Sequence, residues 1–351
     1  MRSIRHLIAS TAIAAAFALG LAGPAAAQKI VISNWDAYMP PDLLENFTKE
    51  TGIETELSVH ATNEEIMGKL MASGGQGFDV VFVTAPFAEA LHKQGLLADL
   101  DPAKIPNLKN LYDEARKLDF DPGNKFAVPY SWGTTGLCYR SDLVKTEPTS
   151  WMDLLKPSDE LKGKVTMLAT DRWLLGAGLL ALGKSVNSTE QADIDAAKKL
   201  LIEAKKNLLA YDDTTFYSKL VSGEAQLVHA WDGWCNYGVA ENPAIKYVVP
   251  KEGSDLFVDT MVVLASSQNQ DAAHKFIDYV LRPEVGQWVA SNILYKVPNR
   301  AAMESLDPAV LQQFPNLGMK PADLLKFEEL RDLGPAQKMY TRAVTEITSA
   351  Q

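Results

Sequence analysis

The first third of the chain alternates β-branched, apolar segments with segments of helical periodicity, and this alternation constrains the fold most strongly. Strand-like segments occupy residues 29–33, 54–59 and 79–83. Apolar residues at helical spacing fill the intervening stretches 42–51 and 64–71. A β-α-β-α-β order predicts a largely parallel sheet with helices on both faces. In such sheets ligands bind beyond the carboxyl ends of the strands.

A second alternating stretch begins near Leu137 and indicates a second α/β unit. The same criteria predict strands at 165–168, 225–230, 245–250 and 258–265, and helices at 174–182, 194–204, 271–281 and 284–291. A helix at 85–94 follows the third strand of the first stretch. No flexible linker separates the two stretches, so we expect more than one crossing of the chain between them. A length of 351 residues suits two domains of ordinary size.

The N-terminus has the pattern of an export signal. Arg2 and Arg5 precede an apolar run over residues 7–22, and residues 25–27 offer an A-x-A cleavage site. The run is shorter than the roughly 20 residues that span a bilayer. We therefore expect a signal peptide over residues 1–27 and a soluble mature protein in the periplasm.

Charge and cysteine content narrow the possible functions. Lys and Arg number 34 against 44 Asp and Glu, a net charge of −10 without any basic run, so we expect no nucleic-acid partner. The two cysteines are Cys138 and Cys235. An oxidising compartment permits a bridge between them, but two buried free thiols are at least as good an interpretation, because sequence alone does not place the pair within reach.

Enzyme and cofactor motifs give no positive signal. The sequence has no G-x-S-x-G, H-E-x-x-H or C-x-x-C pattern, and its five histidines lie far apart. Residues 178–185 match G-x-x-x-x-G-K-S, but the inner Leu-Leu-Ala-Leu is typical of a buried helix rather than a phosphate-binding loop. We expect no enzymatic activity, no cofactor and no metal.

Aromatic residues stand beside carboxylates at four expected strand-to-loop junctions. The stretches are 35–38, 171–173, 231–234 and 257–259. An aromatic face attracts a cation, and a desolvated carboxylate fixes an ammonium group. Each tryptophan taken singly is better explained as core, but four such junctions together favour a binding cleft for a small amine.

Matching stretches throughout the chain are similar to one known family. They are residues 34–40 (NWDAYMP), 47–53, 77–81, 129–136, 250–253 and 281–285. The chain resembles periplasmic polyamine-binding proteins, the spermidine/putrescine type of solute-binding protein that feeds an ABC transporter. The resemblance implies an α/β, type II periplasmic-binding-protein fold, in which two lobes close over a ligand cleft about a hinge. It places lobe 1 at 28–134 plus 260–301, and lobe 2 at 135–259 plus 302–351.

The resemblance also implies a set of ligand-binding residues. They are Trp35, Asp36, Ala37, Tyr38, Thr84, Pro86, Trp173, Trp231, Trp234, Phe257, Asp259 and Tyr295. The family usually has acids at the positions of Ala37, Trp173 and Trp234. Asp259 is retained, and we expect it to pair with the ligand ammonium. A site with fewer acids should hold fewer cations, because each buried charge needs a partner. Asp36 and Asp232 are the first candidates to replace the missing acids.

Arg172 is a further candidate site residue. If it faces the cleft, its guanidinium could clamp a carboxylate, while a surface position at a helix start is an equally good interpretation. The ligand hypotheses are therefore a putrescine- or spermidine-like polyamine, a single-headed amine or ω-amino acid such as γ-aminobutyrate, and another solute such as thiamine or a metal chelate. We expect a monomer that delivers its ligand to an inner-membrane ABC permease.

Overall fold

The computed structural model describes residues 28–350, so the expected signal peptide lies outside the described residues. Strands in this part of the chain join in the order β2-β1-β3-β9-β4-β7-β5-β6, with β10 beside β9 and β8 beside β4. The strands are β1 (Lys29–Asn34), β2 (Glu54–Val59), β3 (Val80–Thr84), β4 (Ala127–Arg140), β5 (Val165–Met167), β6 (Leu208–Tyr211), β7 (Leu227–Trp231), β8 (Ile245–Val248), β9 (Asp255–Val263) and β10 (Glu328–Glu329).

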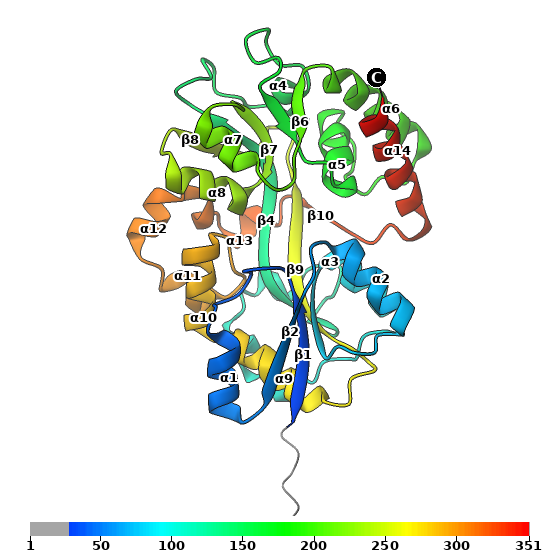
Figure 1. The fold of residues 1–351 in the computed structure, drawn as a ribbon, viewed down its shortest axis with the longest axis vertical. Helices are drawn as coiled ribbons and strands as arrows, with labels where there is room; N and C mark the ends of the chain where they lie inside the picture. Colours follow the sequence, from blue (N-terminus) through cyan, green and yellow to red (C-terminus); the bar gives the residue numbers. More distant parts are fainter. Residues whose placement is uncertain (1–27, 351) are drawn as a thin grey trace, which may run out of the picture.

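Helices cover both ends of this sheet. They are α1 (Leu43–Thr51), α2 (Asn63–Ser73), α3 (Ala85–Lys93), α4 (Trp151–Leu155), α5 (Asp171–Ala181), α6 (Gln191–Lys205), α7 (Phe216–Ser222), α8 (Asp232–Glu241), α9 (Gln270–Val280), α10 (Pro283–Trp288), α11 (Arg300–Glu304), α12 (Pro308–Gln313), α13 (Pro321–Leu324) and α14 (Gln337–Ser349). In Figure 1 the elements β1–β3, α1–α3 and α9–α11 form a lower half, and β5–β8, α4–α8 and α14 form an upper half.

Two parallel groups of strands are joined by antiparallel ones. β1 runs parallel to β2 and β3 in the lower half, and β5 runs parallel to β6 and β7 in the upper half. β9 is antiparallel to β3 and β4, and β4 is antiparallel to β7. The largely parallel sheet expected from the sequence therefore holds within each half only. β4 and β9 cross from one half to the other (Figure 1).

Strand β4 was not evident from the sequence over its full length. Nearly all of its side chains are buried, so no alternation of apolar and polar residues marks it. Its register against β9 shifts between Pro129 and Ser131. Proline has no N–H to give to the ladder, which suits it to an irregular position in a strand.

A disulfide joins Cys138 of β4 to Cys235 of α8, with the two Cα atoms 5.8 Å apart. The sequence left this pairing open, with two free thiols as the alternative, and the structure has the bridge. The match to a phosphate-binding loop is helical over residues 178–181, which end α5, while residues 182–185 follow the helix. A Cβ atom at Gly178 would lie 2.9 Å from Leu201 of α6, so this glycine permits close helix packing.

The C-terminal segment makes a third connection between the halves. β10 pairs with β9, Arg331 donates to the carboxylate of Glu89 on α3, and α14 packs against α5 and α6. The expected lobe boundary at residue 301 falls inside α11, which packs against α10 of the lower half. We propose that the lobes change over at β10 in this segment.

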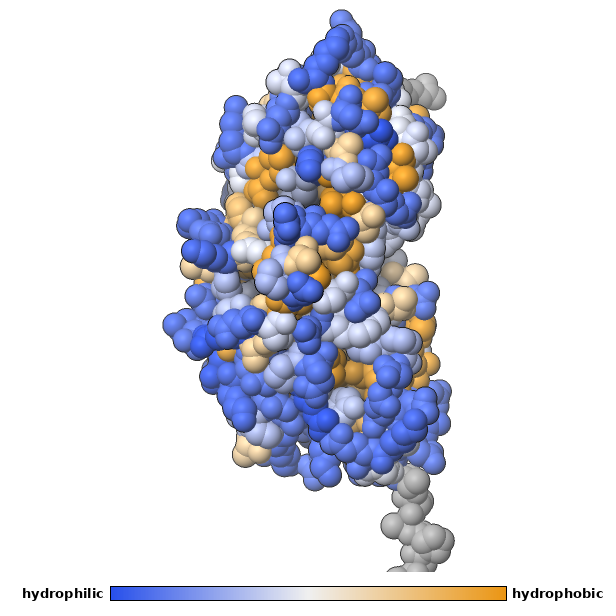
Figure 2. All heavy atoms as spheres, turned by 90° about the vertical axis from the view of Figure 1, so that its left-hand side faces the viewer, coloured by the Kyte–Doolittle hydropathy of each residue, from blue (hydrophilic) through white to orange (hydrophobic). Residues whose placement is uncertain are grey.

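The surface that carries α1 and α10–α12 is mostly hydrophilic, with hydrophobic residues in small separate groups (Figure 2). Within residues 28–350, no helix combines the length and the apolar character needed to cross a membrane. The aromatic residues singled out above are instead largely inside the molecule, where β9 and β4 meet the two halves.

Candidate functional site

Asp259 is the centre of a hydroxyl cluster on the crossing strand β9. It lies directly opposite Thr84 of β3 and Ser131 of β4 in the sheet register. Thr84 Oγ1 donates to Oδ1 at 2.9 Å, and Ser131 Oγ donates to Oδ2 at 3.1 Å. The Tyr38 hydroxyl donates to Oδ2 at 2.9 Å. The side chains of Tyr38, Thr84, Ser131 and Asp259 are called the Asp259 cluster below.

The carboxylate of this cluster has no positive counterpart. Asp259 is 8% exposed, and within the described residues its partners are these neutral hydroxyls, with no Lys, Arg or His in ion-pair contact. Burial raises the pKa of Asp259, although the three hydroxyl donors oppose the shift. A carboxylate offers about four acceptor positions, so a further donor fits. A buried anion of this kind favours a ligand that brings a positive charge.

Two further contacts fix the hydroxyls in place. Asn63, at the start of α2, donates from Nδ2 to Thr84 Oγ1 and accepts from the Thr84 N–H, each at 3.0 Å. The Tyr130 hydroxyl donates to the backbone oxygen of Tyr38 at 2.5 Å. The turn before Tyr38 contains Ala37 in the left-handed region with φ 52°, a conformation that costs a non-glycine residue about 1 kcal/mol or more. These contacts hold the Thr84 hydroxyl and the backbone of Tyr38 in position.

Aromatic rings extend from the Asp259 cluster. The Tyr38 ring lies edge-to-face with Trp35 at 5.5 Å and with Tyr295 at 5.8 Å between centroids. Tyr295 in turn lies 6.1 Å from Phe257. Phe257 is two residues from Asp259 on β9, so both side chains project from the same face of the sheet. We call Trp35, Tyr38, Tyr295 and Phe257 the aromatic wall.

A second aromatic group lies at the upper end of β9. Trp173 of α5 packs edge-to-face on Trp231 at 5.3 Å, and its Nε1 donates to Asp255 Oδ2 at 3.1 Å. Asp255 is buried, also accepts from the Thr135 hydroxyl, and has a pKa raised to about 6 by desolvation. Trp234 packs instead against Tyr217 and Tyr237, at 5.9 and 6.0 Å.

Arg172 lies near Asp255 of the second group, where its charge opposes the rise in the Asp255 pKa, but its hydrogen bonds are made elsewhere. Its NH1 donates to the backbone oxygen of Arg331 at 2.6 Å, and its NH2 donates to Asn187 Oδ1 at 2.6 Å. Its guanidinium also lies over the Tyr340 ring, 5.4 Å from the centroid. The buried guanidinium is therefore held by the C-terminal segment and the chain after α5. The geometry gives no support to a clamp on a ligand carboxylate.

The two acids expected to replace the missing ones differ in their surroundings. Asp36 is exposed. Asp232, the first residue of α8, is buried and forms an ion pair with buried Lys296. Neither therefore provides a buried, unpaired carboxylate like that of Asp259.

Sequence reasoning missed Ser131, Asn63, Asp255 and Lys296 as site residues. The first two are small polar residues without a charge or ring to mark them, and their role depends on sheet register. Asp255 was findable, because it lies at the two-residue strand spacing before Phe257 and Asp259. Lys296 was also findable, as a lysine inside the apolar run 293–297.

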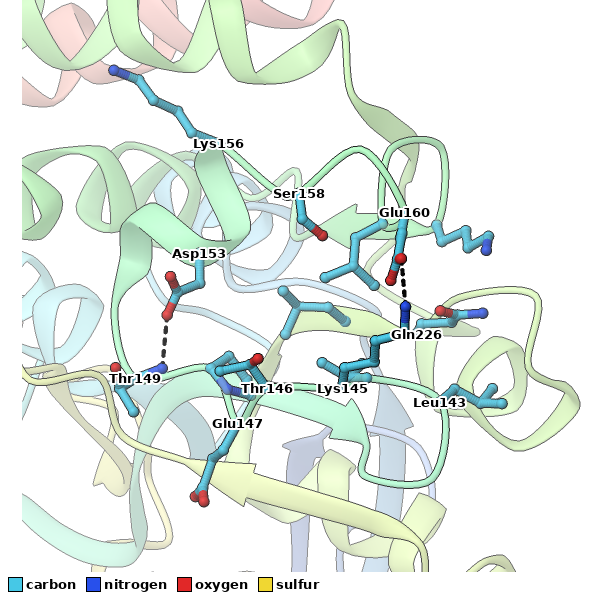
Figure 3. A pocket seen from close by; sticks show the side chains of 15 residues that line it. Leu143, Lys145, Thr146, Glu147, Thr149, Asp153, Lys156, Ser158, Glu160 and Gln226 are labelled. Carbon is cyan, nitrogen blue, oxygen red and sulfur yellow. Dashed lines mark hydrogen bonds and ion pairs between the residues drawn. The ribbon is translucent and has the colours of Figure 1, made fainter.

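A large cavity lies elsewhere in the upper half. It has a volume of about 740 Å³ and is lined by the loop 143–149, α4 and the chain that follows it. Figure 3 shows polar side chains there that pair with neighbours, such as Lys145 with Glu160 and Asp153 with the Thr149 N–H. None of the expected ligand residues lines this cavity. Residues 28–350 also contain no group of three or more His, Cys, Asp or Glu placed to hold a metal ion.

Comparison with known proteins agrees with the fold. The family model for bacterial extracellular solute-binding proteins matches residues 42–317. The chain belongs to this family. A spermidine/putrescine-binding periplasmic protein of Salmonella typhimurium is 33% identical over 339 residues, which cover 96% of this chain and 95% of the relative.

Two other solute-binding proteins are similar over nearly the whole chain. A putrescine-binding periplasmic protein of Escherichia coli is 35% identical over 348 residues, covering 93% of each chain. A spermidine/putrescine ABC transporter substrate-binding protein of Streptococcus pneumoniae has a TM-score of 0.79 and 30% identity, covering 92% of this chain and 98% of that chain. The family resemblance and the periplasmic-binding-protein fold expected from the sequence are confirmed.

Proposed function

We propose that this solute-binding protein captures a small amine of the putrescine or spermidine kind for an ABC importer. The observation that carries the proposal is the buried carboxylate of Asp259, which is surrounded by neutral hydroxyls and lacks a cationic partner among the described residues. An ammonium group would neutralise it and take the acceptor position left free. The names of the relatives support the same ligand class.

The rest of the ligand would lie along the aromatic wall. Methylene groups would gain from burial against Tyr38, Tyr295 and Phe257, at about 25 cal/mol for each Å² of apolar surface removed from water. The indole of Trp35, packed beside Tyr38, would add a cation–π contact of about 0.5–2 kcal/mol. Asp255 would act indirectly, because its hydrogen bond orients the indole of Trp173.

Among the alternatives, an ω-amino acid receives less support than a polyamine. That hypothesis needed Arg172 as a carboxylate clamp, and the guanidinium of Arg172 is held by Asn187 and the backbone of Arg331. The net negative charge of the chain also favours approach of cations over anions.

The cellular role follows from this proposal. The protein would be exported by its N-terminal signal, act in the periplasm as a monomer, and pass its ligand to an inner-membrane permease. It would bind rather than transform its ligand, in keeping with relatives that are named as binding proteins. Trp231 of the upper half, which packs on Trp173, would close on a ligand held at Asp259.

Calorimetric titration with putrescine and spermidine tests the proposal. Asp259→Asn keeps the shape of the side chain and removes its charge. We expect it to lose about 2–5 kcal/mol of binding free energy, the range for truncating one partner of a buried charge pair.

Asp121→Asn is the matched control for this experiment. Asp121 is also buried and accepts three neutral N–H groups, from Lys125, Phe126 and Ala127, but lies outside the site. The affinity of the Asp121→Asn variant for amines should stay at the wild-type value. Unchanged affinity in Asp259→Asn would remove this carboxylate from the binding site.

A further inference from the structure

Lys296 is a buried lysine beside a residue of the aromatic wall. It follows Tyr295 directly, and its ammonium contacts the carboxylate of Asp232. The two side chains are 2% and 1% exposed. Two ions lose their hydration at such a position, and removing one partner alone is strongly destabilising. The pair is therefore a fixed feature of the folded chain.

The pair lies next to the proposed amine site. The Tyr295 ring contacts Tyr38 of the Asp259 cluster at 5.8 Å between centroids. On the other side the ring packs on Gly233, where a Cβ atom would lie 2.3 Å from it. Gly233 follows Asp232 at the start of α8. Burial raises the pKa of the Tyr295 hydroxyl well above its ordinary value, and the charges of Asp232 and Asp259 both add to the shift. One tyrosine ring thus lies between the two carboxylates.

The Asp232 carboxylate faces the aromatic wall with one oxygen. Its Oδ2 accepts from Lys296 and from the N–H and hydroxyl of Thr134, at 3.1 and 3.2 Å. Its buried Oδ1 has no hydrogen-bond partner in the described part of the chain. A Cβ atom at Gly133 would lie 2.5 Å from both Oδ1 and the Phe257 ring, so these two groups border the same small space. This oxygen packs against Gly133 and the Phe257 ring, and the charge of its carboxylate is already balanced by Lys296.

We propose that Lys296 is a specificity-determining residue that takes the place of a second ligand cation at Asp232. This inference rests on the proposed function. Asp232 is neutralised from within, and Asp255 is occupied by the Thr135 hydroxyl and the Trp173 indole close to the Arg172 charge. Asp259 is then the buried carboxylate of this site whose charge is available, and one ammonium group is held strongly. Further ammonium groups of a longer amine add little affinity.

The wild-type protein provides a first test. Pentylamine has the same number of heavy atoms as putrescine, with a methyl group in place of one ammonium. We expect the dissociation constants of pentylamine and putrescine to agree within about tenfold. Spermidine should bind less than about tenfold more tightly than putrescine. A putrescine or spermidine affinity more than a hundredfold above that of pentylamine would overturn the proposal.

Lys296→Met provides the second test, because it frees the Asp232 carboxylate and keeps the side-chain volume. At pH 8 we expect the affinity for putrescine or spermidine, relative to pentylamine, to rise at least about tenfold. The double variant Asp232→Asn/Lys296→Met should return to the wild-type ratio. Lys198→Met, which removes a lysine paired between α6 and α14, should leave the ratio unchanged.

The outcomes separate this inference from the proposed function. If amines bind the wild type and Lys296→Met gains no preference for polyamines, the role of Lys296 is wrong and the function stands. If the wild type binds no amine and Lys296→Met does, the role of Lys296 holds and the function is wrong. Absence of binding in both proteins overturns both. Should Lys296→Met fail to fold, the wild-type series still decides.

Discussion

Asp255 and Asp259 lie four residues apart on β9, and their side chains project from the same face of the sheet with Phe257 between them. Each carboxylate orients one aromatic residue: Asp255 accepts from the Trp173 indole, and Asp259 accepts from the Tyr38 hydroxyl. Four residues of strand span roughly 13 Å. One strand therefore carries two buried acids: Asp255 supports the Trp173 indole, and Asp259 lies among three neutral hydroxyls.

The pKa of Asp255, raised to about 6 by burial, predicts a pH dependence of stability. The folded state holds this proton more tightly than the unfolded chain, so Asp255 makes folding less favourable as pH rises from about 4 to about 6. A shift of about two units corresponds to roughly 3 kcal/mol. Urea unfolding of Asp255→Asn and of the wild type at pH 4.5, 6 and 7.5 measures this contribution to the free energy of unfolding. The variant should gain stability relative to the wild type across this range, and a constant difference would contradict the prediction.

Trp35→Leu and Trp231→Leu should each weaken amine binding. We expect a loss of about 0.5–2 kcal/mol per site, because an indole face is replaced by a residue without an electron-rich ring. Titration calorimetry with putrescine measures it. Trp151 is the control, since it is fully buried beside His229, outside the site. Trp151→Leu should lower the unfolding midpoint and leave affinity intact. If both site variants keep wild-type affinity, these tryptophans are core residues.

Arg172→Met should reduce stability and spare amine binding. The substitution removes the donor to the Arg331 carbonyl at a cost of about 1–3 kcal/mol, while Asn187 Oδ1 keeps the Arg331 N–H as a donor. Chemical unfolding and putrescine titration on the same sample separate the two effects. A large loss of affinity with unchanged stability would return Arg172 to the ligand site.

Reduction of the Cys138–Cys235 disulfide should destabilise the upper half. The bridge closes a loop with a sequence separation of 97, and removing such a link costs about 2–5 kcal/mol. Unfolding of the double variant Cys138→Ala/Cys235→Ala, compared with the wild type with and without a reductant, tests this. The reductant should shift the wild type alone. Equal stability of wild type and variant would show that the bridge contributes nothing.

The sequence predicted the lower half well because its strands carry local signals. β1, β2 and β3 are short and rich in β-branched residues, and the structure has them within a residue or two of the expected positions. β6 (Leu208–Tyr211) was missed because it is short and only partly buried. β9 was expected as a strand at 258–265, but its antiparallel pairing with β3 and β4 was not, because long-range strand pairing leaves no local pattern.

The same distinction applies to the site. Asp259 and the tryptophans attract notice as charges and rings, and family resemblance marks them. Ser131 becomes visible only once the β4–β9 register is known. Arg172 shows the opposite case, because a charged residue between two candidate residues looked functional until its partners in the C-terminal segment were known.

The register shift between Pro129 and Ser131 has a consequence for how this chain tolerates change. In a strand, a slip of one residue turns every later side chain to the opposite face. Downstream of the shift, β4 carries Ser131, which donates to Asp259, and Cys138, which bonds to Cys235. Loss of a single residue at this point would turn both away together. The Ser131 hydroxyl at Asp259 and the disulfide of the upper half therefore depend on the same backbone irregularity. A deletion there would remove both contacts at once.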